Sequence, residues 1–185
     1  GGGAGGASVG VGGGGGVGEA VCEQRGVLPE NDVAGREGGL AARGEEIGAV
    51  SREPGPGNMG MGRPAPGFNA SIRGVSAAHG ALMIADEVLT GFRVGPAGFW
   101  GLEALDGWST ALDDGGSAAA ASPSWPGADW RGRAAWVPDP LTFGKVVGGG
   151  MPPAAPGGRA GGLGLLRAAG PGAQAGELTR NPLVH

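Results

Sequence analysis

Two short apolar runs in this chain each lead to a charged residue, and both are typical of buried strands. Ala81–Ala85 is followed at once by Asp86 and Glu87, and Leu141–Phe143 is followed within two positions by Lys145. Strands buried on both faces of a parallel sheet are continuously apolar, and open α/β sheets bind ligands beyond the carboxyl ends of their strands. Asp86 and Lys145 are therefore the first candidates for a functional site.

The segment ahead of the first run predicts a helix and an earlier strand. Phe68–His79 carries apolar side chains about every 3.6 positions, and Gly80 is a typical residue to end such a helix. Ile47–Ser51 predicts a strand, which ends at Glu53-Pro54 because the residue before a proline is held extended. The order strand, loop, helix, strand predicts a right-handed βαβ unit in a mostly parallel sheet with flanking helices, and so an α/β fold.

Composition limits how much of the chain can form a core. The 185 residues include 46 glycines and 15 prolines, which exceeds the share of roughly 25–30% at which these residues indicate low complexity. We expect residues 1–44 to be low-complexity and disordered, because they bury too little side chain to offset ordering entropy. Residues 45–185 are expected to form a partial cofactor-binding domain with a low-complexity insertion at about 101–136. The alternative for the tryptophans between Trp100 and Trp136 is an aromatic binding surface.

Charge and cysteine content exclude several classes of function. A net charge of −4 and an isoelectric point near 5.1 give no positive surface for nucleic acid. No apolar run approaches the roughly 18 residues of a membrane span, so we expect neither a nucleic-acid nor a membrane partner. One cysteine and two histidines cannot complete a zinc site by themselves, and we expect no metal.

Lys145 is the only lysine in a chain that has 12 arginines. Arginine suffices where only positive charge is needed, whereas a Schiff base requires a primary amine that can lose its proton. A carboxylate at one strand end, this lysine at another and the glycine run Gly148–Gly150 together favour pyridoxal phosphate as a cofactor. Asp86 would keep the pyridine nitrogen protonated, and Lys145 would bind the aldehyde and then move the substrate proton.

Several motifs in the second half of the chain then resemble one enzyme family. They are Asp86-Glu87-Val88-Leu89-Thr90-Gly91-Phe92-Arg93, Pro138-Asp139-Pro140-Leu141-Thr142-Phe143-Gly144-Lys145, Gly148-Gly149-Gly150-Met151-Pro152 and Gly157-Gly158-Arg159. These resemble the class III aminotransferases of fold type I, and linked motifs in one order are far more specific than any one alone. Within that family, the loop with Glu53-Pro54 and Gly57-Asn58-Met59-Gly60 is most similar to the glutamate-1-semialdehyde 2,1-aminomutases.

The resemblance implies a fold type I large domain, here incomplete, and a role for individual residues. Asp86 matches the aspartate that pairs with the pyridine nitrogen of pyridoxal 5'-phosphate, and Val88 the residue packed on the ring. Lys145 matches the catalytic Schiff-base lysine, and Asn58 an asparagine near the phenolic oxygen. The implied reaction converts glutamate-1-semialdehyde, a small amino-aldehyde, to 5-aminolevulinate for tetrapyrrole synthesis.

Two alternatives stay open at this point. One is another class III aminotransferase, acting on an ω-amine or an ornithine-like substrate. The other is a non-catalytic truncated remnant, because Glu177 stands where the family has a threonine that binds the cofactor phosphate, and a carboxylate there would repel a phosphate. The chain does not begin with Met, and we expect a fragment.

Assembly and location follow only from the resemblance and the composition. The resemblance implies a homodimer with active sites near the subunit boundary. The preference for arginine over lysine and the abundance of alanine and glycine indicate a GC-rich coding sequence. This is compatible with a green alga, so a plastid location is expected, with the cytoplasm as the alternative.

Overall fold

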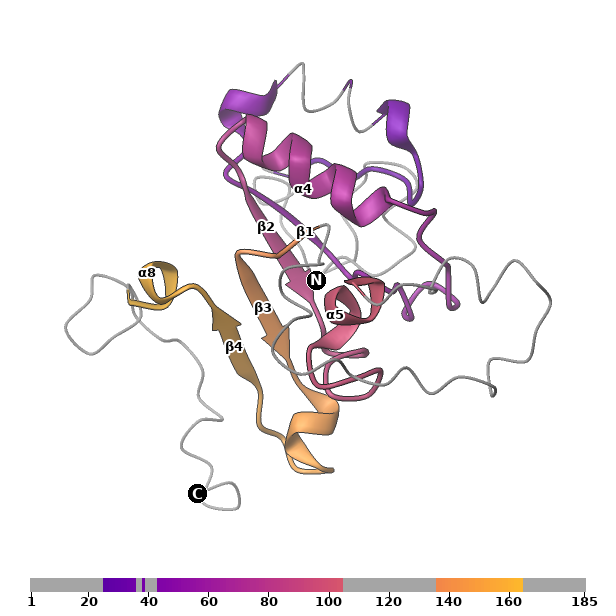
Figure 1. The fold of residues 1–185 in the computed structure, drawn as a ribbon, viewed down its shortest axis with the longest axis vertical. Helices are drawn as coiled ribbons and strands as arrows, with labels where there is room; N and C mark the ends of the chain where they lie inside the picture. The colour runs from indigo at the N-terminus through magenta and orange to yellow at the C-terminus, as the bar shows by residue number, and fades with distance from the viewer. Residues whose placement is uncertain (1–24, 36–37, 39–42, 105–135, 165–185) are drawn as a thin grey trace.

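The computed structural model describes residues 25–35, 38, 43–104 and 136–164, which Figure 1 draws in colour. Within these ranges the chain alternates short strands and helices. In chain order the elements are η1 (Gly44–Glu46), β1 (Ala49–Arg52), α4 (Phe68–Ala78), β2 (Leu82–Asp86), α5 (Gly98–Ala104), β3 (Pro140–Phe143), η2 (Lys145–Gly148), β4 (Ala155–Gly158) and α8 (Ala160–Leu163).

The four strands form one sheet in the order β1-β2-β3-β4. Strands β1, β2 and β3 run parallel to one another, whereas β4 runs antiparallel to β3. Ala85 and Asp86 pair with Leu141 and Thr142, so the ends of β2 and β3 lie side by side. The predicted mostly parallel sheet is confirmed, and the carboxyl ends of its three parallel strands meet at one edge (Figure 1).

Helix α4 confirms the predicted amphipathic helix and packs on β1 and β2 (Figure 1). Gly67, in the left-handed region, precedes its first residue, and His79 caps its last turn. Gly80 has a φ of 71° and ends the helix as expected, because a glycine adopts this conformation without a steric penalty. Phe68 and Ile72 face the sheet and are buried.

The core includes residues from the segment that we expected to be an inserted loop. Phe68, Ile72, Met83, Ala85 and Trp136 form one buried cluster. Helix α5 continues to Ala104, which is also buried. The borders expected for the insertion, 101 and 136, therefore fall on packed residues, and residues 105–135 lie outside the described ranges. The indole of Trp136 fills core volume although its position lies within the segment expected to be an insertion.

Part of the stretch 1–44 also contacts the domain, although we expected disorder there. Glu30 forms an ion pair with Arg52, 2.7 Å between Oε1 and Nη2. The Asn31 amide donates to the carbonyl of Arg63 and accepts from the N–H of Ala65, at 2.8 and 2.7 Å. A few polar contacts thus attach residues 30–31 to the sheet and the following loop, while residues 1–24 lie outside the described ranges. No described helix has the length and apolarity to cross a bilayer.

Candidate functional site

Asp86 is the last residue of β2 and stands at the carboxyl edge of the sheet. Its Oδ1 accepts a hydrogen bond from the N–H of Val88 at 3.0 Å, which turns the chain out of the strand. The next backbone N–H, of Glu87, donates to the carbonyl of Thr142 on β3 at 2.9 Å. The side chain is half-buried, so a carboxylate is held on a fixed backbone and still open to a ligand.

Lys145 lies at the same edge, directly after β3. It begins η2 with a φ of 47°, in the left-handed region. This conformation costs a non-glycine residue about 1–2 kcal/mol, and such strained residues concentrate at functional sites. Its side chain is exposed, and the preceding Gly144 is buried. The amine is therefore presented to solvent by a backbone that packing has fixed.

Val88 connects these two candidates. A Cβ placed on Gly144 would lie 3.4 Å from Cγ1 of Val88, so the valine packs against the backbone next to Lys145. The structure thus brings together Asp86, Val88 and the start of η2 at one edge of the sheet. A planar ring that needs an anion on its nitrogen, an apolar surface on its face and an amine for its aldehyde fits these residues.

The loop after β1 reaches the same edge through Glu53. Its Oε2 accepts from the N–H groups of Gly57 and Asn58, at 2.9 and 3.3 Å. A Cβ on Gly57 would lie 2.7 Å from Cδ1 of Leu89, which shows how closely this loop approaches the turn after β2. Asn58 is exposed. The structure therefore places Asn58 near the Asp86 turn, with Glu53 holding its backbone.

Two phenylalanines add an aromatic surface that the sequence alone did not indicate. The rings of Phe92 and Phe143 lie 5.1 Å apart and tilted by 46°. Gly91 and Gly157 flank the Phe143 ring, and a Cβ on either would lie within 2.9 Å of it. Phe92 is 51% exposed, so an apolar ring faces solvent at the edge that carries Asp86 and Lys145.

Two further carboxyl groups are shielded from solvent: Glu87 is fully buried and Glu103 is partly buried. Glu87, which the sequence places directly after Asp86, accepts from the N–H of Phe99 and from the hydroxyl of Thr90. Glu103 accepts from the amide of Asn69 at 2.8 Å and from the indole N–H of Trp136. Burial raises the pKa of both carboxyl groups, and the hydrogen bonds oppose that rise. Glu103 was missed because nothing in its sequence neighbourhood indicates a buried partner.

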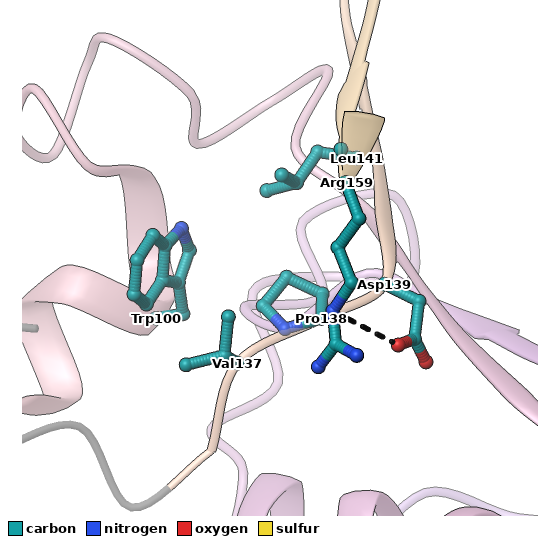
Figure 2. A pocket seen from close by; sticks show the side chains of 7 residues that line it. Trp100, Val137, Pro138, Asp139, Leu141 and Arg159 are labelled. Atoms are coloured by element: carbon teal, nitrogen blue, oxygen red, sulfur yellow. Dashed lines mark ion pairs between the residues drawn. The ribbon is translucent and has the colours of Figure 1, made fainter. Parts of the chain in front are cut away.

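The pocket of Figure 2 lies at the opposite end of the strands. It has a volume of about 290 Å³ and is lined by Trp100, Val137, Pro138, Asp139, Leu141, Gly158 and Arg159. The guanidinium of Arg159 is drawn beside Asp139, with which it forms an ion pair of 3.6 Å. Asp139 also pairs with Arg73 of α4 and accepts from the N–H of Met83 at 2.9 Å. These groups join α4, β2 and β4, and the pocket is separate from Asp86 and Lys145.

The other residues singled out in the sequence have structural surroundings or lie outside the described ranges. A Cβ on Gly148 would lie 2.8 Å from Cδ of Pro153, so this glycine allows close packing beside the lysine. The ring of His79 occupies the space next to Gly44. Glu177 belongs to residues 165–185, outside the described part of the chain.

The class III aminotransferase family matches residues 32–110. The chain is 47% identical over 158 residues to a glutamate-1-semialdehyde 2,1-aminomutase of Cutibacterium acnes, covering 85% of this chain and 30% of that protein. It is 43% identical over 184 residues to the enzyme of the same name from Tropheryma whipplei, covering 98% and 37%. The chain thus spans between 30% and 37% of the length of these relatives.

Solved structures support the fold. An omega-transaminase from Sphaerobacter thermophilus superposes with a TM-score of 0.67 and 26% identity, over 89% of this chain and 31% of that one. A beta-phenylalanine aminotransferase from Variovorax paradoxus gives a TM-score of 0.55 at 28% identity, over 83% and 29%. A transaminase with bound PLP gives 0.64 at 22% identity, over 87% and 31%, which bears on the fold alone. The fold is therefore that of part of a transaminase large domain.

Proposed function

We propose that this chain, whose residues 32–110 match the class III aminotransferase family, carries part of a pyridoxal phosphate site of a glutamate-1-semialdehyde 2,1-aminomutase. The proposed reaction moves the amino group of glutamate-1-semialdehyde to the neighbouring carbon and yields 5-aminolevulinate, for tetrapyrrole synthesis. The names and the identity of the curated relatives support this choice within the family. Glutamate-1-semialdehyde is favoured over an ω-amine as the substrate because the curated relatives at 43–47% identity are named as aminomutases.

The observation that carries the proposal is the packing of Val88 against Gly144. It joins the turn after Asp86 to the backbone of Lys145, so that the carboxylate and the amine belong to one site. Pyridoxal phosphate, when bound, supplies an electron sink for charge that develops on the substrate carbon. Asp86 would accept the hydrogen bond of the ring nitrogen and keep that nitrogen protonated, and Val88 would contact the ring face.

Lys145 has two tasks in this proposal. Its primary amine would hold the cofactor aldehyde before substrate arrives, and afterwards act as the base and acid that moves a proton on the substrate carbon. The left-handed conformation of Lys145 fixes the direction in which the side chain leaves the backbone. Asn58, held by Glu53 on the neighbouring loop, would donate its side-chain amide to the ring oxygen.

The test uses the single lysine. We would incubate the purified chain with pyridoxal phosphate, reduce with borohydride and locate the covalent label by mass spectrometry. Saturable labelling of Lys145 is expected, and the Lys145→Arg variant, which keeps the charge but cannot form the bond, should lose it. The α-amino group is the other reactive amine and serves as an internal measure of unspecific labelling.

The outcome also separates the alternatives. Labelling of Lys145 no stronger than in urea-denatured protein would contradict the proposal and identify a non-catalytic remnant. If Lys145 is labelled, glutamate-1-semialdehyde and an ω-amine should be compared as substances that displace the label before reduction. Preferential displacement by the ω-amine would assign the site to another class III aminotransferase.

Assembly and location are parts of the same proposal. We propose a homodimer, supported by apolar side chains exposed at the carboxyl edge, among them Met61 at 81% and Phe92 at 51%. The plastid location rests on composition alone and stays a prediction, and the relatives named above are bacterial proteins.

A further inference from the structure

Glu87 is a carboxylic acid that is fully buried directly beside the candidate cofactor ligand Asp86. Both of its carboxyl oxygens lie near the N–H of Phe99, at 2.8 and 3.0 Å, and Oε2 also bonds to the hydroxyl of Thr90. A buried carboxyl group is costly to desolvate, and a site retains one only where such bonds compensate. The side chain thus connects the start of α5 to the turn that follows β2.

The backbone around this carboxyl group is shaped to admit it. Gly98 has a φ of 68°, and a Cβ at this position would lie 2.6 Å from Cδ and Oε1 of Glu87. Helix α5 has seven residues and an amphipathic pattern interrupted by glycines, so its own sequence stabilises it weakly. The bond from Phe99 to Glu87 therefore anchors the first turn of α5, while Glu103 anchors its last turn through Asn69 and Trp136.

The main chain of Glu87 is held as firmly as its side chain. Its N–H donates to the carbonyl of Thr142 at 2.9 Å, and its carbonyl accepts from the N–H of Gly91 at 2.7 Å. Successive side chains of a strand point to opposite faces of the sheet. Glu87 therefore fastens one face of the strand end to α5, while Asp86 is directed to the other face. Any rotation of the backbone at Glu87 would redirect Asp86 and Val88 together.

We propose that Glu87 is a positioning residue of the cofactor site: its buried side chain clamps α5 to the turn 86–91 and thereby fixes the direction of the Asp86 carboxylate. The inference rests on the proposed function for its consequence, since Asp86 is the residue that would contact the ring nitrogen. It assigns Glu87 no contact with substrate or cofactor.

The surroundings of Glu87 support this role. Burial, and to a smaller extent the charge of Asp86, raise the pKa of Glu87, whereas its hydrogen bonds lower it. The other groups that face Glu87 are uncharged: the Thr90 hydroxyl on the turn and the backbone N–H groups of Phe99 and Trp100 on α5. The Thr90 hydroxyl and the Phe99 N–H both donate to its carboxyl oxygens, so the side chain holds the turn and α5 together as an acceptor.

Two variants test the role of the Glu87 side chain. Glu87→Gln keeps its size and hydrogen-bonding groups but cannot ionise, whereas Glu87→Ala removes the side chain beyond Cβ. Glu103→Ala is the matched control. Glutamine keeps an acceptor for Phe99 and a donor for Thr90, whereas alanine removes both. Glu103 is a partly buried carboxyl group of α5 whose pKa is also raised by burial, but it bonds to Asn69 and Trp136 and not to the turn. If Glu87 only stabilised the fold, Glu87→Ala and Glu103→Ala should affect the turn 86–91 equally.

The first measurement is hydrogen exchange of the full-length chain without cofactor, at the amides of Val88 and Gly91. Glu87→Ala should accelerate exchange there by about tenfold, the equivalent of one lost buried hydrogen bond. Glu87→Gln should stay within about threefold of the unmodified chain, and Glu103→Ala should leave Val88 and Gly91 unchanged. Unchanged exchange in Glu87→Ala, or equal acceleration in Glu103→Ala, would overturn the inference.

A variant that does not fold and a chain that does not bind the cofactor each have a distinguishable result. If Glu87→Ala does not fold, Glu87→Gln decides alone, because rapid exchange at Val88 in a folded glutamine variant, which keeps the shape and an acceptor for Phe99, would contradict the positioning role. The second measurement is saturation of the borohydride label on Lys145, which should need about tenfold more pyridoxal phosphate in Glu87→Ala but not in Glu103→Ala. Absence of label in the unmodified chain would refute the proposed cofactor site, while the exchange data would still judge the positioning role.

Discussion

Gly91 shows how a single missing methyl group determines the packing at the edge of the sheet. A Cβ there would lie 2.6 Å from Cδ1 of Phe143 and 2.7 Å from the backbone oxygen of Glu87. The phenylalanine ring could move only toward Gly157, where the space is also limited, and the backbone oxygen is fixed. Gly91→Ala should therefore lower the free energy of unfolding by about 1–3 kcal/mol, as overpacked cores do. Urea denaturation followed by tryptophan fluorescence measures this difference.

Gly74 is a glycine of the same chain at which alanine should have the opposite effect on the free energy of unfolding. It lies inside α4, is exposed, and an added Cβ would meet no atom within 4 Å. Gly74→Ala should raise the free energy of unfolding by about 1 kcal/mol, because alanine is the better helix former. A loss of stability in both variants would show that the sensitivity is general and not a consequence of the contact with Phe143.

Between β2 and β3, the packing of α5 depends on two buried acids, and these should give the protein an unusual response to pH. Burial raises the pKa of Glu87 and Glu103 above the ordinary value of 4.5, which applies in the unfolded chain. As pH rises above 4.5, the unfolded chain therefore releases these protons before the folded chain does. The unfolded state then binds fewer protons, so stability falls with rising pH until the raised pKa values are passed.

The glutamine variants isolate this contribution. Glu87→Gln and Glu103→Gln cannot titrate, so their urea midpoints should decline less than that of the unmodified chain between pH 4.5 and neutral pH. Each variant is compared with the unmodified chain at every pH, which removes the response of surface carboxylates. A parallel pH profile in both variants would mean that the two acids ionise in the folded chain as they do in the unfolded one.

The sequence predicted the elements whose patterns are local. The apolar run before Asp86 predicted β2, and the 3.6-residue period predicted α4, each to within one residue at either end. The ends of β2 and β3 lie side by side, so Asp86 and Lys145 share the carboxyl edge of the sheet. Helix α5 was not predicted, because its glycines weaken the local pattern and it depends on a carboxylate 12 positions away. Trp136 and Glu103 were missed for the same reason, since their bond joins residues 33 positions apart. Contacts between residues so far apart in the sequence depend on the tertiary structure, and they produce no periodic pattern of apolar residues in the sequence.

At the scale of the molecule, five of the exposed apolar side chains in the described ranges follow the carboxyl ends of the parallel strands. Met59 and Met61 come after β1, Phe92 after β2, and Val147 and Met151 after β3. Because parallel strands end at one edge, these side chains surround the edge that holds Asp86 and Lys145. Exposed apolar groups gathered in one place are typical of an interface. We therefore expect the proposed homodimer to use this edge, so that dimerisation and the cofactor site depend on the same loops.

Met61→Asn tests that expectation without disturbing the core. Met61 is 81% exposed and has a φ of 58°, a conformation that asparagine tolerates better than methionine, so the fold should be retained. Sedimentation velocity over a range of concentrations should show self-association weakened by about tenfold, the usual effect of removing a well-buried interface side chain. Leu82→Thr is the control, since Leu82 is 50% exposed but lies at the start of β2, away from this edge. Equal weakening in both variants would indicate unspecific hydrophobic association, and dimers unaffected by Met61→Asn would place the subunit boundary elsewhere on the molecule.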